Sequence, residues 1–282
     1  MKELRGRVAA VTGGASGLGR AMALAFARAG MHVAIADVDE ASLERIAAEL
    51  RAAGVKAHAA RVDVSKAEEI ERWALDVRAA LGGVHIVCNN AGVSPLGLAW
   101  ENTLADWQWT LGVNLWGVIH GVRAFTPMLI EQDEGHIVNT ASVAGLITPP
   151  GSAMYNVTKH AVVALSETLH HDLAERKSKV GVSVLCPAYV STGIADSERS
   201  RPVDLANPKR EKSPELKARE AMLRKAVSSG KLSADDIARA VVDAVKQDRF
   251  YILTHPRISG AIRARMEAIL EGRPPSNPLR DA

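Results

Sequence analysis

The sequence predicts an α/β fold built on one doubly wound parallel sheet. Short runs of mostly apolar residues recur along the chain, and most are continuous rather than alternating, as in strands that are buried on both faces. Segments with apolar residues at helical spacing separate these runs. Such βαβ alternation with right-handed crossovers places helices on both faces of a parallel sheet.

The order of the expected elements follows from these patterns. We expect about seven strands, at residues 8–11, 33–36, 57–62, 84–87, 136–139, 182–185 and 250–253. Leu43, Ile46 and Leu50 mark the apolar face of one helix, and Ile70, Trp73 and Val77 that of the next. The result is a Rossmann-type fold, which we expect to form a single dinucleotide-binding and catalytic domain over residues 1–282.

Composition excludes several classes of protein. The 35 Lys and Arg against 32 Asp and Glu leave a formal charge of +3, too small to argue for nucleic-acid binding. Two cysteines, with no CxxC or HExxH motif, predict neither a disulfide framework nor a metal site. No apolar run reaches the roughly 18 residues of a membrane span. We therefore expect a soluble, cytoplasmic protein without a membrane partner.

Residues 196–230 break the alternating pattern. Between Arg199 and Lys225, nine basic and four acidic residues accompany three prolines and few large apolar side chains. Two interpretations fit equally: a mobile basic lid over a site, or a surface insertion with one exposed helix at 214–227. We expect its basic residues to be solvated, although an arginine there could bind a substrate carboxylate. The proline-rich residues 272–282 predict an extended tail.

A glycine-rich turn joins the first strand to the first helix. Gly13, Gly17 and Gly19 have the spacing GxxxGxG, with Ser16 and Leu18 between them. Glycines permit a sharp turn and close approach of a ligand, and the following helix N-terminus favours a pyrophosphate. This context predicts a nucleotide site.

Two acidic residues follow later strands. Asp37 ends the second strand, where a carboxylate can accept both ribose hydroxyls of an adenosine and would repel a 2′-phosphate. Neither Ser16 nor Val38 is basic, and no cation is placed to receive that phosphate, so NAD is favoured over NADP. Asp39 suits the cap of the following helix better than Asp37 does. Asp63 ends the third strand and could face the adenine edge or cap the residues before Ser65; both remain open.

Four polar residues point to chemistry. Tyr155 and Lys159 are spaced to share one face of a helix, Ser142 follows a strand, and Asn114 lies in an apolar helix, where an Asn commonly bonds a neighbouring carbonyl. With the glycine turn they resemble the short-chain dehydrogenase/reductase family over residues 5 to about 195. The resemblance rests on the following residues: 12–19, Asp37, Asp63, 89–92, Asn114, Ser142, Tyr155, Lys159 and 187–192.

The resemblance implies catalytic roles. Tyr155 would be the general acid/base, and Lys159 together with a positive nicotinamide would lower its pKa from the ordinary value of about 10. Lys159 would also hold the nicotinamide ribose. Ser142 would bind the substrate oxygen, and Asn114 would hold a water that links Lys159 to solvent.

The resemblance also implies further cofactor contacts. They come from Val64, Asn90, Ala91, Gly92, Pro187, Val190 and Thr192. Val190 and Thr192 would bind the carboxamide of the nicotinamide. Ala188 departs from the family, which most often has glycine there, and narrows the space by a methyl group.

The substrate side is expected to be apolar. Residues near the catalytic set that would line it are Pro95, Leu96, Val143, Ile147, Tyr189 and Ile194. Such a pocket suits a hydrophobic alcohol or ketone. Residues 183–202 and 250–256 are also similar to dehydrogenases of lignin-type benzylic alcohols, which favours a bulky secondary alcohol. The tryptophans at 100–116 could border the substrate, but we expect them to serve helix packing or a subunit interface. We expect the adjacent His170 and His171 not to form a metal site.

The leading function is that of an NAD-dependent dehydrogenase or reductase for secondary alcohols or ketones. Two alternatives are an NAD-sensing regulatory module without turnover, and an epimerase or dehydratase of the same fold. The family resemblance implies a homotetramer or homodimer formed through helices at about 103–131 and 152–176.

Overall fold

Seven parallel strands form one sheet in the computed structural model, which describes residues 1–208 and 213–279. Their order is β3-β2-β1-β4-β5-β6-β7, and every neighbouring pair is parallel. The strands are β1 (Val8–Thr12), β2 (His32–Asp37), β3 (Ala57–Arg61), β4 (Ile86–Asn89), β5 (Gly135–Thr140), β6 (Val180–Cys186) and β7 (Tyr251–Leu253). The predicted fold class is confirmed, and the predicted strands differ only at their ends.

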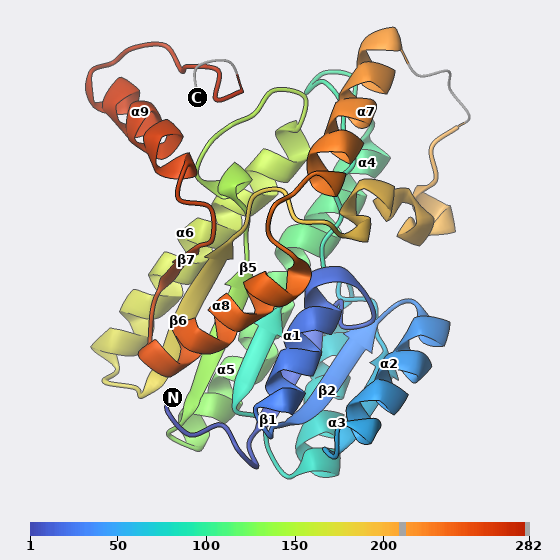
Figure 1. The fold of residues 1–282 in the computed structure, drawn as a ribbon, viewed down its shortest axis with the longest axis vertical. Coiled ribbons are helices and arrows are strands. Elements are labelled where there is room, and N and C mark those ends of the chain that lie inside the picture. The colour runs from blue at the N-terminus through green and yellow to red at the C-terminus, as the bar shows by residue number, and fades with distance from the viewer. Residues whose placement is uncertain (209–212, 280–282) are drawn as a thin grey trace.

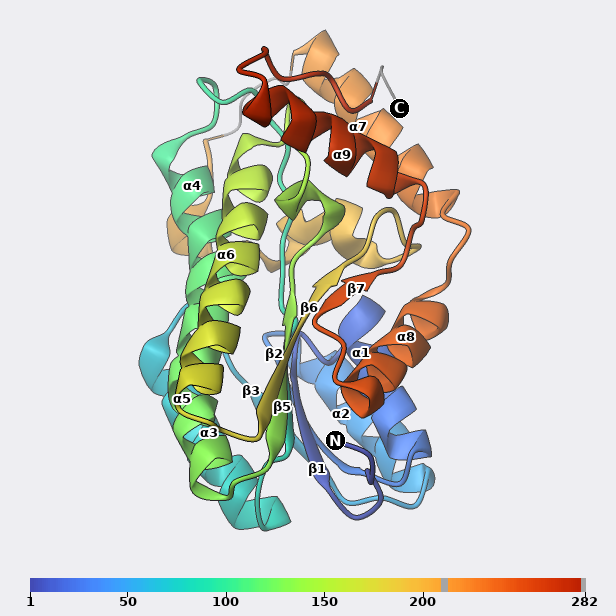
Figure 2. The same ribbon diagram turned by 90° about the vertical axis from the view of Figure 1, so that its left-hand side faces the viewer.

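Helices cover both faces of the sheet (Figures 1 and 2). One face carries α1 (Gly17–Arg28), α2 (Glu40–Ala52) and α8 (Ala234–Gln247). The other carries α3 (Ala67–Leu81), α5 (Gly117–Glu131) and α6 (Ala153–Glu175). The remaining helices, α4 (Leu104–Leu111), α7 (Pro214–Ser228) and α9 (Ile258–Leu270), gather at the end of the molecule opposite the N-terminus.

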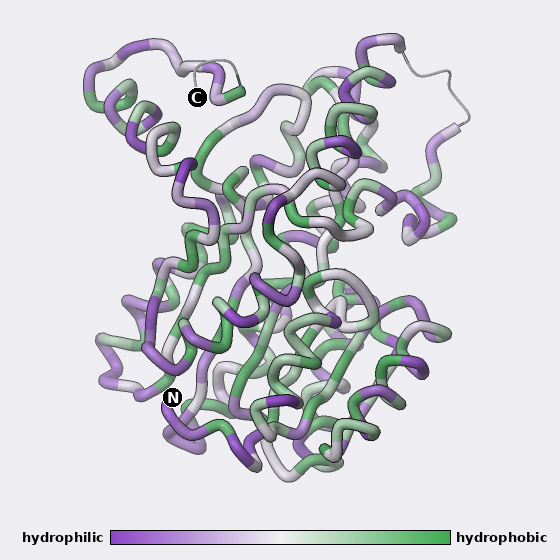
Figure 3. Tube along the Cα trace, viewed as in Figure 1, coloured by the Kyte–Doolittle hydropathy of each residue, from purple (hydrophilic) through white to green (hydrophobic). Residues whose placement is uncertain are grey.

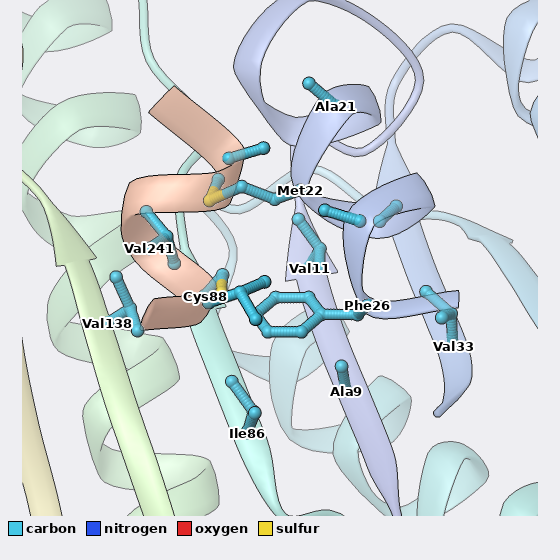
Figure 4. Close-up of a cluster of buried hydrophobic side chains, with 14 of the residues drawn as sticks. Ala9, Val11, Ala21, Met22, Phe26, Val33, Ile86, Cys88, Val138 and Val241 are labelled. Carbon is cyan, nitrogen blue, oxygen red and sulfur yellow. The ribbon is translucent and has the colours of Figure 1, made fainter. Parts of the chain in front are cut away.

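Alternation along the strands builds two cores. In β1, Val11 packs in one core with Phe26 of α1, whereas Ala10 faces Trp73 and Phe125 in the other. The Trp73 and Phe125 rings meet edge to face with centroids 5.5 Å apart. Figure 4 shows the first core, and in Figure 3 the strands form the hydrophobic interior of the chain trace. Burying each such large side chain contributes roughly 1.5–3 kcal/mol, which makes the sheet a rigid platform.

The predicted helix at 103–131 is interrupted. Between α4 and α5, residues Gly112–Trp116 form a π-helical turn, which widens the helix by one residue and turns Asn114 fully inward. Such turns occur frequently at functional sites. Asn114 therefore lies in a π-helical turn and not in a regular apolar helix.

The strand order switches between β1 and β4: β2 and β3 are added on one side of β1, and β4 to β7 on the other. In a doubly wound sheet, the crevice beyond the carboxyl ends of these strands is where ligands bind. Residues 209–212 of the expected lid and 280–282 of the expected tail lie outside the described residues. Of the remaining tail, residues 273–277 form neither helix nor strand.

Candidate active site

A cavity of about 800 Å³ opens at the carboxyl ends of the strands. It brings together most of the site residues that the sequence predicts. These are Gly13, Ser16, Gly17, Leu18, Asp37, Asp63, Val64, Asn90, Ala91, Gly92, Ser142, Tyr155, Lys159, Pro187, Val190 and Thr192. Gly19 and Asn114 are not part of the lining. Its volume lies toward the upper end of the range typical of small-molecule pockets.

The glycine turn shapes one end of this cavity. Gly13 and Gly17 have φ values of +63° and +52°, which side chains with a Cβ rarely adopt. A Cβ on Gly13 would lie 2.9 Å from Ala91 Cα, and one on Gly19 would overlap the carbonyl oxygen of Gly13. Gly19 thus serves close packing of the turn. Ser16 makes no side-chain cap, so the first N–H groups of α1 remain available to an anion.

Backbone amides hold the Asp37 carboxylate at the mouth of β2. Its Oδ2 accepts from Ala15 N (3.1 Å), and its Oδ1 accepts from Val38 N (2.8 Å) and Asp39 N (3.2 Å). Asp39 caps α2 by accepting from Ser42 N, as the sequence indicates. The two carboxylates therefore have different structural roles.

Asp63 makes the capping hydrogen bond that was one of the two roles left open for it. Its Oδ1 accepts from Ser65 N at 2.9 Å, which closes the turn before α3. Asp63 also lines the cavity, next to Val64.

The turn after β4 is fastened to β1 and to the π-helical turn. Thr12 Oγ1 accepts from Asn90 N (2.9 Å) and Ala91 N (3.1 Å). Asn114 Oδ1 accepts from Val93 N, and Asn114 Nδ2 donates to Val93 O, both at 2.8 Å. Asn114 thus bonds nearby backbone, the simpler of the two roles considered for it.

Tyr155, Lys159 and Ser142 converge on the cavity from α6 and from the end of β5. Lys159 Nζ lies 5.6 Å from the Tyr155 ring centroid and donates to Thr140 O at 2.7 Å. Ser142 Oγ lies 3.3 Å from Pro187 O, to which it donates, and also accepts from Ala144 N. A phenol, an ammonium and a hydroxyl therefore face one space.

Burial shifts the pKa values of this set. It raises the pKa of Tyr155, and a hydrogen bond with Ser142 offsets part of that rise. Lys159 is only 2% exposed. Its burial lowers the pKa of the ammonium group to about 8. The groups of this chain therefore raise the pKa of Tyr155, whereas the sequence led us to expect a lowered one. Positive charge close to the phenol, from Lys159 or from a bound ligand, favours the phenolate and would lower this pKa.

The far end of the cavity is mostly apolar. Five of the six expected substrate-side residues line it, namely Leu96, Val143, Ile147, Tyr189 and Ile194, whereas Pro95 does not. Trp109, one of the tryptophans that could border the substrate, also lines the cavity. Sequence reasoning missed other lining residues: Arg199, Arg219, Met222, Leu223, Pro278 and Leu279. Only the concentration of basic residues after Arg199 hinted at any of them.

Comparison with known proteins decides the family. A sequence profile described as short chain dehydrogenase matches residues 7–202. The chain belongs to the short-chain dehydrogenase family.

Relatives extend the match to nearly the whole chain. A short-chain dehydrogenase/reductase from Burkholderia phymatum, solved in complex with NAD, has a TM-score of 0.96 and 48% identity, over 98% of each chain. The 1-deoxy-11-beta-hydroxypentalenate dehydrogenase of Streptomyces exfoliatus is 38% identical over 89% of this chain and 84% of its own. The CLA biosynthesis dehydrogenase/reductase of Lactiplantibacillus plantarum is 30% identical over 100% of this chain and 99% of its own.

Arg201 corrects one expectation about this short-chain dehydrogenase. The sequence predicts solvated basic residues after Arg199, but the Arg201 side chain is only 7% exposed. It pairs with Asp106 (2.7 Å) and Glu198 (2.8 Å), and its guanidinium lies 4.3 Å from the Trp109 ring centroid. A buried, doubly paired arginine fastens the segment after β6 to α4. Trp109 is buried there, whereas Trp100 and Trp116 are exposed.

The cysteines, the hydropathy of the helices and the placement of possible metal ligands complete the description of this dehydrogenase. Cys88 and Cys186 are buried free thiols in strands. Along residues 1–208 and 213–279, no helix has the length and apolar character needed to cross a bilayer. In the same ranges, no group of three or more His, Cys, Asp or Glu could hold a metal ion.

Proposed function

We propose that this short-chain dehydrogenase is an NAD-dependent oxidoreductase that interconverts a bulky apolar secondary alcohol and its ketone. The observation that carries the proposal is the meeting of Tyr155, Lys159 and Ser142 with the glycine turn and Asp37 in one cavity. Two relatives support it: one was solved with NAD, and another is named as a dehydrogenase of a hydroxypentalenate.

The cofactor end fits a dinucleotide. The glycines leave the space that a Cβ would fill, and the free N–H groups of α1 suit a pyrophosphate. Asp37 would accept the adenosine ribose hydroxyls, with Asp63, Val64 and the 90–92 turn beside the adenosine. Lys159, Val190 and Thr192 would hold the nicotinamide half. When bound, NAD supplies the hydride chemistry and a positive charge in the oxidised form.

Tyr155 would exchange the proton of the substrate oxygen. Its raised pKa keeps the phenol protonated, which suits its use as the acid in ketone reduction. In alcohol oxidation, Tyr155 acts as the base once positive charge beside it lowers that pKa. Ser142 would donate to the substrate oxygen and fix its carbon in place. Lys159 remains mostly protonated at neutral pH and would stabilise the phenolate.

The segment after β6 would form a wall of the substrate site. Ser197, Leu205 and Met222 of this segment line the cavity, and Arg201 fastens it to Asp106. We propose that the described parts of residues 196–230, which include α7, act as a substrate lid within the single catalytic domain.

We propose that this enzyme assembles into a homodimer or homotetramer through α5 and α6. Val157 on α6 is half exposed, and so is Trp116, in the turn that leads into α5. Apolar surface on these two long helices would fit a homodimer or homotetramer. Light scattering after gel filtration measures the mass directly, and a monomer at micromolar concentration would overturn this assignment.

Asp37→Ala is expected to weaken NAD⁺ binding by at least about tenfold and to affect NADP⁺ binding far less. The variant loses the acceptor of two ribose hydroxyls and the repulsion toward a 2′-phosphate. Arg199 also lines the cavity and helps to lower the pKa of Asp39, so a cation lies near this end. The measurement is the Kd of each cofactor by fluorescence titration.

Asp39→Ala is the matched control for that measurement. It removes the cap of α2, which costs about 1 kcal/mol of stability, but leaves the ribose acceptor in place. Equal losses for NAD⁺ and NADP⁺ in Asp37→Ala would show that Asp37 does not bind the ribose.

Turnover tests the proposed function itself. The enzyme is offered NAD⁺ or NADP⁺ with aliphatic, steroidal and benzylic secondary alcohols, and formation of reduced cofactor is followed by absorbance. We expect turnover with NAD⁺ on bulky apolar alcohols. If NAD⁺ binds but no alcohol of the panel is oxidised, the NAD-sensing regulatory module is favoured. Product formation without net cofactor reduction would favour an epimerase or dehydratase.

A further inference from the structure

Three cationic side chains line the cavity within the described part of the chain: Lys159, Arg199 and Arg219. Lys159 lies beside Tyr155 and belongs to the proposed proton transfer. Arg199 donates to Gly193 O (2.8 Å) and Asp196 O (2.9 Å) and acts on Asp39, which places it toward the cofactor end. Arg219 is the one that these assignments leave unexplained.

Arg219 projects from α7 onto the loop that leads into α6. Its Nη1 donates to Pro150 O at 3.3 Å. The same nitrogen would lie 2.8 Å from a Cβ built on Gly151, so the guanidinium rests directly on this loop. The loop ends where α6 begins, at Ala153, and Tyr155 lies in the first turn of that helix. Arg219 is thus half-buried at the substrate end of the cavity, on the same wall as the catalytic tyrosine.

No acidic side chain in residues 1–208 or 213–279 pairs with Arg219. Its neighbours on this segment differ in that respect, because Arg201 pairs with Asp106 and Glu198, and Arg224 pairs with Asp196. The nearby lining from α7 consists of Met222, Leu223 and Val227. A half-buried guanidinium whose charge is not balanced, facing an apolar cavity, is suited to an anionic ligand.

We propose that Arg219 binds a carboxylate of the substrate, which defines the substrate class as an apolar hydroxy acid and its keto acid. This inference rests on the proposed function. In the oxidation, the carbinol carbon would give a hydride to NAD⁺ and the hydroxyl would give its proton to the phenolate form of Tyr155, while the carboxylate at Arg219 is unchanged. The apolar walls between Tyr155 and Arg219 would hold the hydrocarbon skeleton that joins the two groups.

A carboxylate fits better than a phosphate for reasons of charge. One guanidinium balances the single charge of a carboxylate and can bind it through two parallel hydrogen bonds. A phosphate monoester carries a larger charge, and desolvating it against apolar walls such as Ile147 and Leu223 would be costly.

Binding tests the inference without requiring the true substrate. Adamantane-1-carboxylate and adamantane-1-carboxamide have the same apolar body and differ in charge. Their affinities for the enzyme–NADH complex are measured by isothermal titration calorimetry for wild type, Arg219→Gln and Arg219→Lys. Arg224→Gln is the matched control, since Arg224 lies on the same helix, is exposed and is not part of the lining.

We expect wild type to bind the carboxylate more tightly than the carboxamide by about tenfold to 100-fold. Arg219→Gln should remove that preference and leave carboxamide binding unchanged, Arg219→Lys should retain part of it, and Arg224→Gln should match wild type. Equal binding of both probes to wild type, or the same loss in Arg224→Gln as in Arg219→Gln, would overturn the assignment.

Turnover separates this inference from the function on which it rests. Hydroxylated apolar acids are compared with their methyl esters as substrates for NAD⁺ reduction. If both are oxidised with equal kcat/KM, the carboxylate assignment fails and the oxidoreductase stands. If Arg219→Gln abolishes carboxylate binding but no alcohol in any panel is oxidised, the anion site stands and the proposed reaction fails.

Discussion

Tyr155→Phe is expected to lower kcat for alcohol oxidation by about 10²- to 10⁴-fold, the usual contribution of a general acid/base. The substitution removes only the phenolic oxygen, so the wall of the cavity keeps its shape. NAD⁺ affinity should change by less than about threefold, because the ring and Lys159 remain in place. Steady-state kinetics and fluorescence titration on the same preparation measure the two quantities.

Tyr251→Phe provides the control for this change. Tyr251 is one of three tyrosines in the chain, and its hydroxyl donates to Glu167 Oε1 at 2.6 Å, outside the cavity lining. Its loss should leave kcat unaltered. Retention of more than about a tenth of the wild-type kcat in Tyr155→Phe would show that another group transfers the proton.

Lys159→Met is expected to lower turnover by about 100-fold while increasing the stability of the folded protein at neutral pH. Burial lowers the Lys159 pKa from 10.5 to about 8, so the charged form is less favourable in the folded state. This pKa shift corresponds to a destabilisation of about 3 kcal/mol. The variant also loses the hydrogen bond to Thr140 O, which costs about 1 kcal/mol, so the net gain in stability is smaller. A neutral methionine of similar length avoids this cost.

The pH dependence gives a second signature of the same residue. Between pH 8 and 10.5 the unfolded chain holds a proton on Lys159 that the folded protein releases, so the free energy of unfolding rises with pH through this window. Denaturant titrations at several pH values should show this rise in wild type and its disappearance in Lys159→Met. Lys179→Met, which removes an exposed lysine paired with Asp133, serves as the control. A Met variant that keeps the wild-type slope would show that Lys159 does not carry a buried charge.

The sequence predicts the scaffold well because its signals are local. Continuous apolar runs mark the strands, and the glycine turn combines strand, turn and helix within residues 8–28. The proposed catalytic pair is recognisable because Tyr155 and Lys159 are close in sequence. Asp39 as a cap likewise depends only on its nearest neighbours.

The remaining features depend on contacts between distant residues. The inward position of Asn114 comes from a π-helical turn, and its partner Val93 belongs to another segment. Arg201 is buried only because Asp106 and Trp109 meet it across the fold. The position of Arg219 depends on how α7 packs, which no spacing of residues reveals. Composition could indicate a basic segment, but not which of its arginines faces the cavity.

The pairing of Arg201 with Asp106 has a consequence for how the specificity of such enzymes can change. Residues 193–207 and α7 supply one wall of the proposed substrate site, whereas Leu96, Val143 and Ile147 line it from earlier parts of the chain. The stretch that holds residues 193–207 and α7 could be exchanged between homologues as a cassette without redesigning the nucleotide site. However, the ion pair that holds this stretch in place joins it to a residue outside it, because Asp106 belongs to α4. A productive graft must therefore carry both ends of the ion pair, and natural variants that lose one should have lost the other.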